Sequence, residues 1–480
     1  MSGPFGSTAW MANPASGLYP FEISNSLRFN SNDTPILNKT YGSAGTSVDT
    51  WTVSWWMKLS EGNAQQKVIF GGGGTFVGGS NVATFISMGG SSYDGGVGSG
   101  VPKIVLQQYN SGEVVNVMAP AFLRDHSAWY HCVVRFDSTQ STDTNRVRIY
   151  INGIESPSYT KYDGGTVIYP NQNADSTIGG ATEHYIGKGW QANKEFGGYM
   201  ADFNYCDGQS LAPSSFGEFK NDIWVPKNTS GLTFGTNGFR MQFKQTGTGT
   251  NASGMGADTS GNDNHYAVSG LAATDVSADT PTNNFCLPNL ANKSDDIVFS
   301  EGNTKAVYST YSQSPNGTIG ANSGKWYYEV KMAGTHARMG FCESHCPQGD
   351  ADTSTTFPLY AVYSNGSNGL TVYNSVTAKS ATANTGYTSF SDGDTLGLAL
   401  DIDNGKFYAH LNGTYYTSGD PANGTGALIT SIAAQRGGTF LPYLSCGTDN
   451  SRTFEFNFGA PSHAISSGNA DENGHGNFEY

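Results

Sequence analysis

The chain has 480 residues and a formal net charge of -14, and charged residues make up only 13% of it. Its length predicts two or three domains, and its acidic balance argues against a nucleic-acid partner, which would require clustered Lys and Arg. No apolar run is long enough to cross a bilayer, and the first ten residues lack the basic and apolar regions of a secretory signal, so we expect neither membrane insertion nor Sec-type export.

The composition predicts an all-β protein. The chain contains 63 glycines, 26 tyrosines and 26 phenylalanines, and hardly any window repeats apolar residues at i, i+3, i+4 and i+7. Many short strands joined by tight turns fit this mixture better than long helices do.

The first 20 residues predict an arm. They are rich in Gly, Ala and Pro and cannot form a core on their own. Phe5, Trp10 and Tyr19 are isolated aromatic residues within them. The arm either docks on a neighbouring subunit or a larger assembly, for attachment or oligomerisation, or lies on its own domain.

From Phe21 onward the pattern is that of strands. In the segment Trp51–Leu59 the apolar Val53, Trp55 and Met57 alternate with the positions of Thr52, Ser54 and Trp56. One face of this strand is therefore strongly apolar. Further strands are predicted at SLRF, at WYHCVVRF, at VRIYI and at YIG. An Asn-Gly pair after VRIYI predicts a type I′ hairpin.

The segment from Gly197 to Trp224 closes this first domain. Met200, Phe203 and Tyr205 form one apolar series that ends at an Asp-Gly turn. The following residues predict a short helical segment that lays aromatic rings on a sheet; they are Leu211, Ser214, Ser215, Phe216, Phe219 and Trp224.

The ordered set SLRF, WTVSWWMKL, WYHCVVRF, VRIYING and YIG, with the closing GGYMADFNYCDGQSLAPSSFG, resembles a laminin-G-like (concanavalin A-like lectin) domain as found in virion proteins of marine bacteriophages. The resemblance covers residues 21–225 and implies a jelly-roll β-sandwich. It also raises the questions of glycoside hydrolysis and of calcium binding. Relatives of this fold include glycoside hydrolases, and some of these domains hold calcium at their rim.

Trp190 is the candidate for ligand binding. It lies in the loop-like GKGWQANKEF, near Tyr185 and Asn193. A ring between polar neighbours suits sugar stacking, whereas a loop Trp can also fold back over the core or meet a neighbouring subunit.

No catalytic residues are predicted. Retaining glycosidases need two carboxylates about 5 to 5.5 Å apart, and no E-x-D-x-E run supplies them. Asp202 stands alone on the closing strand, and three glutamates fall in loop-like or helical contexts; they are Glu183, Glu195 and Glu218.

No cofactor and no metal centre are predicted, although calcium stays open. Cys342, His345 and Cys346 have no second pair at ligand spacing, and Cys132 and Cys206 are expected to be small core residues. Turn aspartates are common without metal, and those that could donate oxygens to calcium are Asp163, Asp175 and Asp207.

Residues 226–300 are predicted to be a turn-rich linker. The runs D-x-S-G-N-x-N-H and D-T-P-T-N-N-F resemble linkers that phage fibre proteins place between such domains. Phe285, Leu287 and Leu290 are expected to dock this linker on the next domain.

Residues 301–463 resemble a SPRY domain, a two-sheet β-sandwich that binds peptides or proteins through loops on one rim. The resemblance rests on GKWYYEVKM, MGFCES, DGDTLGLALDIDNGKFYAHLNG, TFLPYLSCG and FEFNFG in this order. Four aspartates of the third block, Asp392, Asp394, Asp401 and Asp403, are interpreted as turn residues. The polar tail 464–480 is expected to be extended.

We therefore expect two antiparallel β-sandwich domains in series, in a non-enzymatic structural protein of the phage particle surface. A tail fibre, head fibre or decoration protein would bind host-surface glycans or other virion proteins, and the fibre resemblance implies a homo-oligomer, expected to be a trimer. Two alternatives stay open: a depolymerase of host envelope polysaccharide, and a purely structural decoration with no host ligand.

Overall fold

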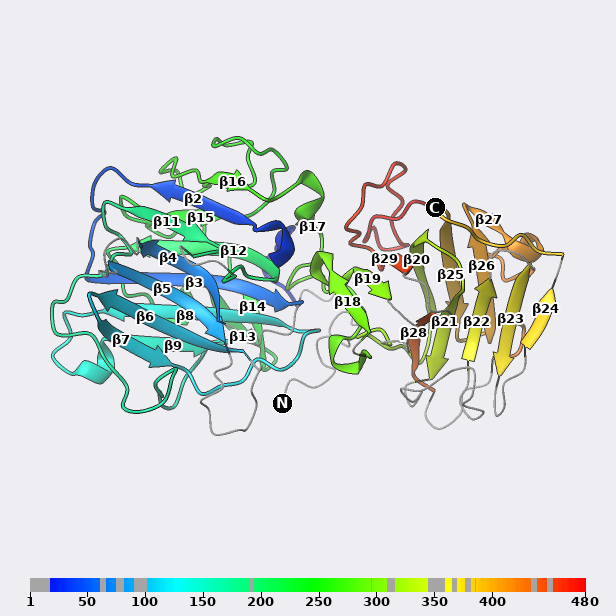
Figure 1. Cartoon of the computed structure of the whole chain (residues 1–480), viewed down its shortest axis with the longest axis horizontal. Coiled ribbons are helices and arrows are strands. Elements are labelled where there is room, and N and C mark those ends of the chain that lie inside the picture. Colours follow the sequence, from blue (N-terminus) through cyan, green and yellow to red (C-terminus); the bar gives the residue numbers. More distant parts are fainter. Residues whose placement is uncertain are drawn as a thin grey trace. The chain divides into compact units, whose positions relative to one another are not determined.

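The computed structural model describes residues 18–60, 66–74, 82–89, 102–189, 193–294, 296–308, 316–343, 359–364, 369–375, 381–384, 386–432, 438–446 and 452–480. The chain forms two compact units, Met1–Asn284 and Phe285–Tyr480 (Figure 1). Within the described residues the helices are short 3-10 turns, and none could span a membrane. They are η2 (Ser31–Asp33), η3 (Asp143–Asn145), η4 (Pro213–Ser215), η5 (Ala273–Asp275), η6 (Leu290–Asn292), η7 (Glu301–Asn303) and η8 (Tyr416–Ser418).

The first unit is built from two antiparallel sheets, here called the first and the second sheet. In the described residues the first sheet has the order β10-β9-β8-β3-β12-β1-β17, with β15 paired to β12. Its strands are β1 (Ser26–Phe29), β3 (Thr50–Leu59), β8 (Trp129–Asp137), β9 (Val147–Ile151), β10 (Ile154–Glu155), β12 (Gly198–Asp207), β15 (Phe239–Met241) and β17 (Val276–Ser277).

The second sheet has the order β16-β2-β11-β4-β5-β6-β7, and Figure 1 shows β4 to β7 side by side. Its strands are β2 (Ile36–Thr40), β4 (Lys67–Gly73), β5 (Val82–Gly89), β6 (Lys103–Asn110), β7 (Glu113–Met118), β11 (Glu183–Ile186) and β16 (Ala267–Ser269). The strand segments predicted from the sequence are all present, and Asn152 and Gly153 have the positive φ values, 49° and 78°, of a type I′ turn.

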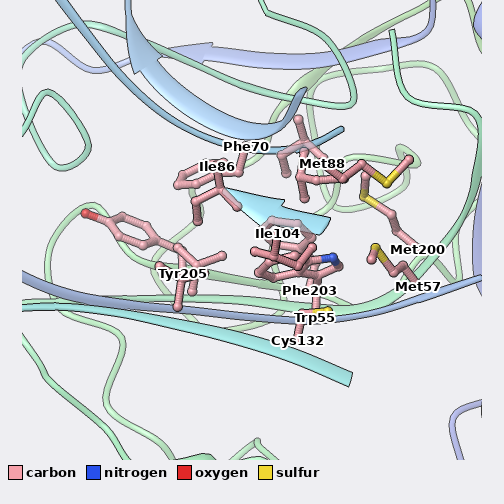
Figure 2. Packing of buried hydrophobic residues seen from close by; sticks show 14 of the residues in the cluster. Trp55, Met57, Phe70, Ile86, Met88, Ile104, Cys132, Met200, Phe203 and Tyr205 are labelled. Atoms are coloured by element: carbon pink, nitrogen blue, oxygen red, sulfur yellow. The ribbon is translucent and has the colours of Figure 1, made fainter. Parts of the chain in front are cut away.

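The core of the first unit lies between these sheets. Trp55 and Met57 from β3 face Ile86 and Met88 from β5 across the interior, and Figure 2 shows them converging with their neighbours. The predicted apolar face of β3 is therefore the core face. Cys132 and Cys206 are fully buried, as predicted for small core residues, and burial raises the pKa of the Cys206 thiol to about 12.

A β-bulge explains the spacing of the closing strand β12. The pairing of β12 with β3 shifts between Ala201 and Asn204, and Asp202 has a left-handed φ of 40°. One extra residue reverses the side-chain alternation, so Met200, Phe203 and Tyr205 all face the core despite their uneven spacing.

The segment after β12 differs from the prediction. Instead of a helical segment up to Trp224, η4 is followed by a hairpin of β13 (Gly217–Lys220) and β14 (Ile223–Pro226). Asn221 and Asp222 both have positive φ, 52° and 63°, which suits a two-residue hairpin turn. Phe219 and Trp224 form a cross-strand pair with ring centroids 5.0 Å apart.

This hairpin covers the outer face of the first sheet. The Trp224 indole N–H donates to His131 Nδ1 (3.0 Å), and His131 lies 4.8 Å from the Trp56 ring. A second apolar cluster lies beside them and contains Val133, Tyr150, Cys206, Phe216 and Phe234. Both faces of the first sheet are consequently buried.

The predicted linker is largely part of the first unit. Strands β15, β16 and β17 lie within residues 226–284 and pair with β12, β2 and β1. Asp279 binds the Lys58 ammonium (2.7 Å) and the Trp129 indole N–H (3.0 Å). The boundary therefore lies near residue 284 and not at residue 225, because the linker's turns bring complementary polar groups to buried positions on the sheets.

The second unit is also a two-sheet sandwich in its described residues. One sheet has the order β18-β19-β29-β20-β25-β26-β27 and the other β24-β23-β22-β21-β28. The strands are β18 (Ile297–Ser300), β19 (Lys305–Tyr308), β20 (Lys325–Ala333), β21 (Ala337–Glu343), β22 (Leu359–Ser364), β23 (Leu370–Ser375), β24 (Ala381–Asn384), β25 (Thr395–Asp401), β26 (Lys406–Leu411), β27 (Thr414–Tyr415), β28 (Phe440–Cys446) and β29 (Arg452–Asn457).

The predicted docking residues belong to this second unit. Phe285 and Leu287 are buried, and Leu290 packs against the second core. Gly459 has a φ of 121°, and a Cβ there would lie 2.2 Å from the Phe285 ring, so the absence of a side chain lets the ring approach. The predicted docking is confirmed.

Candidate functional site

The outer face of the second sheet presents one continuous cross-strand row. Pairing in register places the members side by side on strands β2, β11, β4, β5, β6 and β7 in turn. The row mixes aromatic rings with primary amides and consists of Asn38, Tyr185, Gly71, Phe85, Gln107 and Asn116.

Aromatic side chains form the middle of this face. A Cβ at Gly71 would lie 2.7 Å from the Tyr185 ring and 2.9 Å from Phe85 Cβ, so Tyr185 lies flat over a glycine. The Phe85 ring is stacked on Tyr109, with centroids 6.1 Å apart and planes at 5°. Phe85 and Tyr185 are buried, whereas Tyr109 is half-buried and marks the accessible end of the aromatic group.

Polar side chains converge on Glu113 at the same end. Glu113 Oε1 accepts hydrogen bonds from Asn116 Nδ2 (2.7 Å), Gln107 Nε2 (3.2 Å) and the Tyr109 hydroxyl (3.3 Å). Gln66 extends the network by donating to Ser87 Oγ (2.9 Å) and to Gln107. Three side chains from the two strands β6 and β7 therefore donate to one carboxylate.

Lys161 joins two carboxylates at the edge of this network. Its ammonium lies 3.0 Å from Glu113 Oε2 and 2.7 Å from Asp163 Oδ1. The side chains of Lys161 and Glu113 are each 17% exposed and that of Asp163 is 49% exposed. Thr160 positions Lys161, because its backbone pairs with that of Met118 on the edge strand β7 (2.8 and 2.9 Å).

The charges are reflected in two pKa shifts. Burial and the adjacent Glu113 carboxylate raise the pKa of Tyr109 to about 12, so this hydroxyl remains a proton donor at neutral pH. Hydrogen bonds to Asp163 and Glu113 raise the pKa of Lys161 above its ordinary value. The site therefore holds one fixed cation between two carboxylates.

This arrangement is suited to binding a polyhydroxylated ligand. The half-buried Tyr109 ring provides apolar contact, and amides, a hydroxyl, an ammonium and carboxylates offer both donors and acceptors within a few ångströms. Within the described residues, no three His, Cys, Asp or Glu side chains group as metal ligands.

A buried Ser–His pair among the described residues of this unit, Ser54 and His131, is oriented for structure. His131 Nδ1 accepts from Trp224, so Nε2 carries the proton and donates to Ser54 Oγ (2.8 Å). A general base would instead accept the serine proton. Burial lowers the pKa of His131 to about 3, which keeps the ring neutral.

The structure places the predicted site residues in different environments. Trp190, Phe5 and Trp10 lie outside the described residues. Tyr185 belongs to the aromatic row, buried over Gly71. Asn193 and Tyr19 lie outside this row.

Asn193 is exposed, in a left-handed conformation (φ 62°). The carbonyl of the next residue, Lys194, accepts from the Val68 N–H (2.9 Å), and Val68 packs in the cluster that contains Tyr185. Asn193 therefore borders the outer face without joining the polar network. Tyr19 is half-buried, and burial raises its pKa.

The candidate calcium donors are engaged within the protein. Asp207 accepts three backbone N–H groups, from Thr46 (2.6 Å), Ser47 (3.0 Å) and Asn237 (2.9 Å). Asp163 pairs with Lys161. The Asp175 carbonyl accepts from Gln108 (2.7 Å). The carboxylates of Asp207 and Asp163 therefore have partners within the protein, whereas the Asp175 contact is made by its backbone carbonyl.

Sequence reasoning missed Glu113, Lys161 and Asp163 as a group. Lys161 and Asp163 lie about 50 residues beyond Glu113, and no motif links them. The available signal was KIVLQQYN, in which Gln107 and Tyr109 share the outward face opposite Ile104 and Leu106.

Comparison with family models agrees with the two sandwiches. Residues 36–209 match the concanavalin A-like lectin/glucanases superfamily, and residues 325–461 match the SPRY domain. The chain carries a concanavalin A-like domain followed by a SPRY domain. The predicted all-β fold class, with these two domains in series, is confirmed, and both domain types point to carbohydrate or protein binding.

Several solved structures are similar to part of this chain. The SAP-like pentraxin from Limulus polyphemus is 18% identical, with a TM-score of 0.27, and the match covers 40% of this chain and 80% of that chain. A protein from Bacteroides ovatus, to which carbohydrate binding has been ascribed, is 13% identical over 52% of this chain and 58% of that one, with a TM-score of 0.32. The SPRY domain of human HERC1 is 14% identical, with a TM-score of 0.23, and the match covers 36% of this chain and 91% of that chain. No curated protein matches the chain.

Proposed function

We propose that this chain is a non-enzymatic structural protein of a phage particle whose concanavalin A-like domain binds a glycan on the outer face of the second sheet. The single observation that supports the binding site best is the convergence of Tyr109, Gln107, Asn116 and Lys161 on Glu113 beside a stacked aromatic pair. The binding requires no cofactor.

The two faces of the sandwich favour this location. The outer face of the first sheet is covered by the β13–β14 hairpin and by residues 275–284. At the β6–β7 end of the second sheet, by contrast, Asp163 is half-exposed and Tyr109 is half-buried. A ligand can therefore reach this end from solvent.

The position of Lys161 favours binding over hydrolysis. A glycosidase places the scissile oxygen between its two carboxyl groups, whereas here the Lys161 ammonium lies between Glu113 and Asp163. Glu113 is also fixed by three neutral donors. Such a carboxylate is well placed to orient hydroxyl groups and poorly placed to act as an acid.

Support for the virion assignment comes from the sequence resemblance alone. The D-x-S-G-N-x-N-H and D-T-P-T-N-N-F runs resemble the linkers of phage fibre proteins, and the long closing-strand segment resembles that of phage virion proteins. We accordingly propose a location on the exterior of the particle, as a homo-oligomer, with a trimer expected from the fibre resemblance.

Glycan binding is tested with the full chain on an array of host envelope saccharides, followed by calorimetry of the best ligand. Glu113→Gln removes one charge at constant size and is expected to weaken binding at least tenfold. Lys244→Met, which removes an exposed lysine outside this face, is the matched control and should bind like the natural chain. An array without signal, or equal affinities for the three proteins, would contradict the proposed site.

A polysaccharide depolymerase is the second candidate, favoured by the proximity of Glu113 and Asp163. Incubation with host envelope polysaccharide should release no new reducing ends. Release that disappears in the Glu113→Gln variant would overturn the non-enzymatic assignment.

The virion assignment has its own test. Mass spectrometry of purified particles should detect the chain, and light scattering should give the mass of an oligomer. A monomer that is absent from the particles would defeat this part of the proposal while leaving glycan binding intact.

A further inference from the structure

The tail of the second unit is folded, in contrast to the predicted extended end. Residues 464–480 form a small hairpin in which the backbones of Asn469 and Phe478 pair (2.9 and 2.7 Å) around a turn capped by Asp471. Its last residues lie on the outer face of the sheet that contains β20, β25, β26 and β29. The segment 477–480 is therefore bound like a short peptide.

Two side chains of the sheet hold this segment through its backbone. The Glu329 carboxylate accepts the backbone N–H groups of Glu479 (3.0 Å) and Tyr480 (2.9 Å). Asn457 Nδ2 donates to the carbonyl oxygen of Asn477 (2.9 Å) and also to Glu329 (2.9 Å). These contacts recognise the backbone of an extended segment and do not depend on the identity of its side chains.

Two aromatic side chains of the segment fill defined positions. The Phe478 ring meets Tyr327 edge to face, with centroids 5.3 Å apart, and is buried. The Tyr480 ring packs against His410 at 5.5 Å and over Gly413, where a Cβ would lie 2.6 Å from it. The site therefore selects aromatic residues two positions apart.

A directed chain of hydrogen bonds prepares the carboxylate for this role. The Gly413 N–H donates to His410 Nδ1 (3.2 Å), so His410 Nε2 donates to the Tyr327 hydroxyl (2.7 Å), which donates to Glu329 (2.9 Å). Gly397 lies beneath the imidazole, since a Cβ there would be 1.9 Å from Nε2. Glu329 is thus buried, oriented and still able to accept two peptide N–H groups.

We propose that the face around Glu329 is a peptide-binding site for an extended segment with aromatic residues at positions i and i+2, and that residues 477–480 occupy it as an internal competitor of a partner protein's segment. A buried carboxylate loses stabilisation when its donors leave, so the site favours exchange of one peptide for another over an empty state. The inference is independent of glycan binding by the first unit.

The test uses a fluorescent peptide of residues 466–480 and the full chain. The natural chain, whose site is filled, should bind the peptide weakly, and Tyr480→Ala, which weakens the internal segment, should bind it at least tenfold more tightly. Phe478→Ala with Tyr480→Ala should bind at least as tightly as the single variant. Glu472→Ala, in the exposed turn of the same hairpin, is the matched control and should behave like the natural chain.

Specificity is tested in the Tyr480→Ala background. Adding Glu329→Gln should abolish peptide binding, a scrambled peptide should not bind, and a peptide in which Lys replaces the residue between the two aromatics should bind as well as the original. Circular dichroism confirms folding; if the double tail variant unfolds, Tyr480→Ala decides alone, because Tyr480 is 44% exposed. Failure of the folded Tyr480→Ala chain to bind, or binding unaffected by Glu329→Gln, would overturn the proposal.

Discussion

The first unit contains two lysines that each bind a carboxylate distant in sequence, Lys58 with Asp279 and Lys161 with Glu113, and their surroundings differ. Lys58 on the first sheet binds Asp279 (2.7 Å) and Asn284 (2.7 Å), and both charged side chains are fully buried. Lys161 beside the second sheet binds Glu113 and Asp163 with part of each side chain in solvent. The same ion-pair chemistry is fully buried in one place and partly exposed to solvent in the other.

The difference comes from what covers each sheet. Residues 275–284 lie over Lys58, and Trp129 donates to the same Asp279 carboxylate (3.0 Å), so the charges are compensated inside the protein. Around Lys161 the edge strand β7 and the half-exposed Asp163 leave polar groups able to exchange protein partners for ligand partners. Separate substitutions at the two lysines should therefore separate stability from binding.

The largest expected effect is at the buried pair. Lys58→Met leaves the Asp279 charge without its cation, and breaking a buried pair in this way costs about 3 to 5 kcal/mol. Urea unfolding followed by tryptophan fluorescence measures this loss in the first unit, where every tryptophan except Trp326 lies. A loss below about 1 kcal/mol would show that the pair is dispensable.

Acid should destabilise the first unit through two buried neutral histidines. Burial lowers the folded pKa of His131 to about 3 and that of His184 to about 4. The unfolded chain, with a histidine pKa of about 6.5, binds more protons below that pH. Stability should therefore fall as pH falls from about 6.5, and His184 alone should cost about 3 kcal/mol by pH 4.

Urea midpoints at pH 7, 6 and 5 measure this effect, since carboxylates of ordinary pKa titrate mainly below that range. His184 accepts the Gly179 N–H at Nε2 (2.9 Å), and protonation would place two donors against each other. Midpoints that do not change between pH 7 and pH 5 would contradict the buried, neutral assignment.

Removing the accessible ring should weaken glycan binding. Tyr109→Ala deletes the ring stacked on Phe85 and the hydroxyl on Glu113, which should cost about 1 to 2 kcal/mol, or roughly five- to thirtyfold in Kd. Tyr109→Phe keeps the ring and should lose less. Calorimetry that gives equal affinities for the two variants would assign the ring no role.

The smallest expected effect on stability is at the second lysine. Lys161→Met breaks two partly exposed ion pairs, which together contribute about 1 kcal/mol or less. Its urea midpoint should stay close to that of the natural chain while glycan affinity falls. A stability loss as large as that of Lys58→Met would abolish the distinction between the two regions.

Strand positions were predictable because alternation in segments such as Trp51–Leu59 is a local property of the sequence. The Asp202 bulge and the β13–β14 hairpin were not, because they depend on left-handed backbone at Asp202, Asn221 and Asp222 that non-glycine residues adopt only in a supporting fold. The structural role of the D-x-S-G-N-x-N-H motif could also not be predicted from the sequence. Asp258 in D-T-S-G-N-D-N-H accepts the Arg240, Ser260 and Asn264 N–H groups, so the motif is a structural turn.

The candidate site could be predicted only in part. Tyr185 follows from the strand resemblance, whereas the meeting of Glu113 with Lys161 depends on the backbone pairing of Thr160 with Met118, which no periodicity encodes. The tail site was missed for a similar reason, since Glu329 and Tyr480 are 151 residues apart in sequence.

The most direct test of glycan binding is hydrogen–deuterium exchange of the full chain with and without the saccharide selected by array. Glycan binding at the proposed site should slow exchange in β6, β7 and residues 160–163 and should change it little in the second unit. Protection confined to the SPRY domain, or to the β13–β14 hairpin on the first sheet, would contradict it.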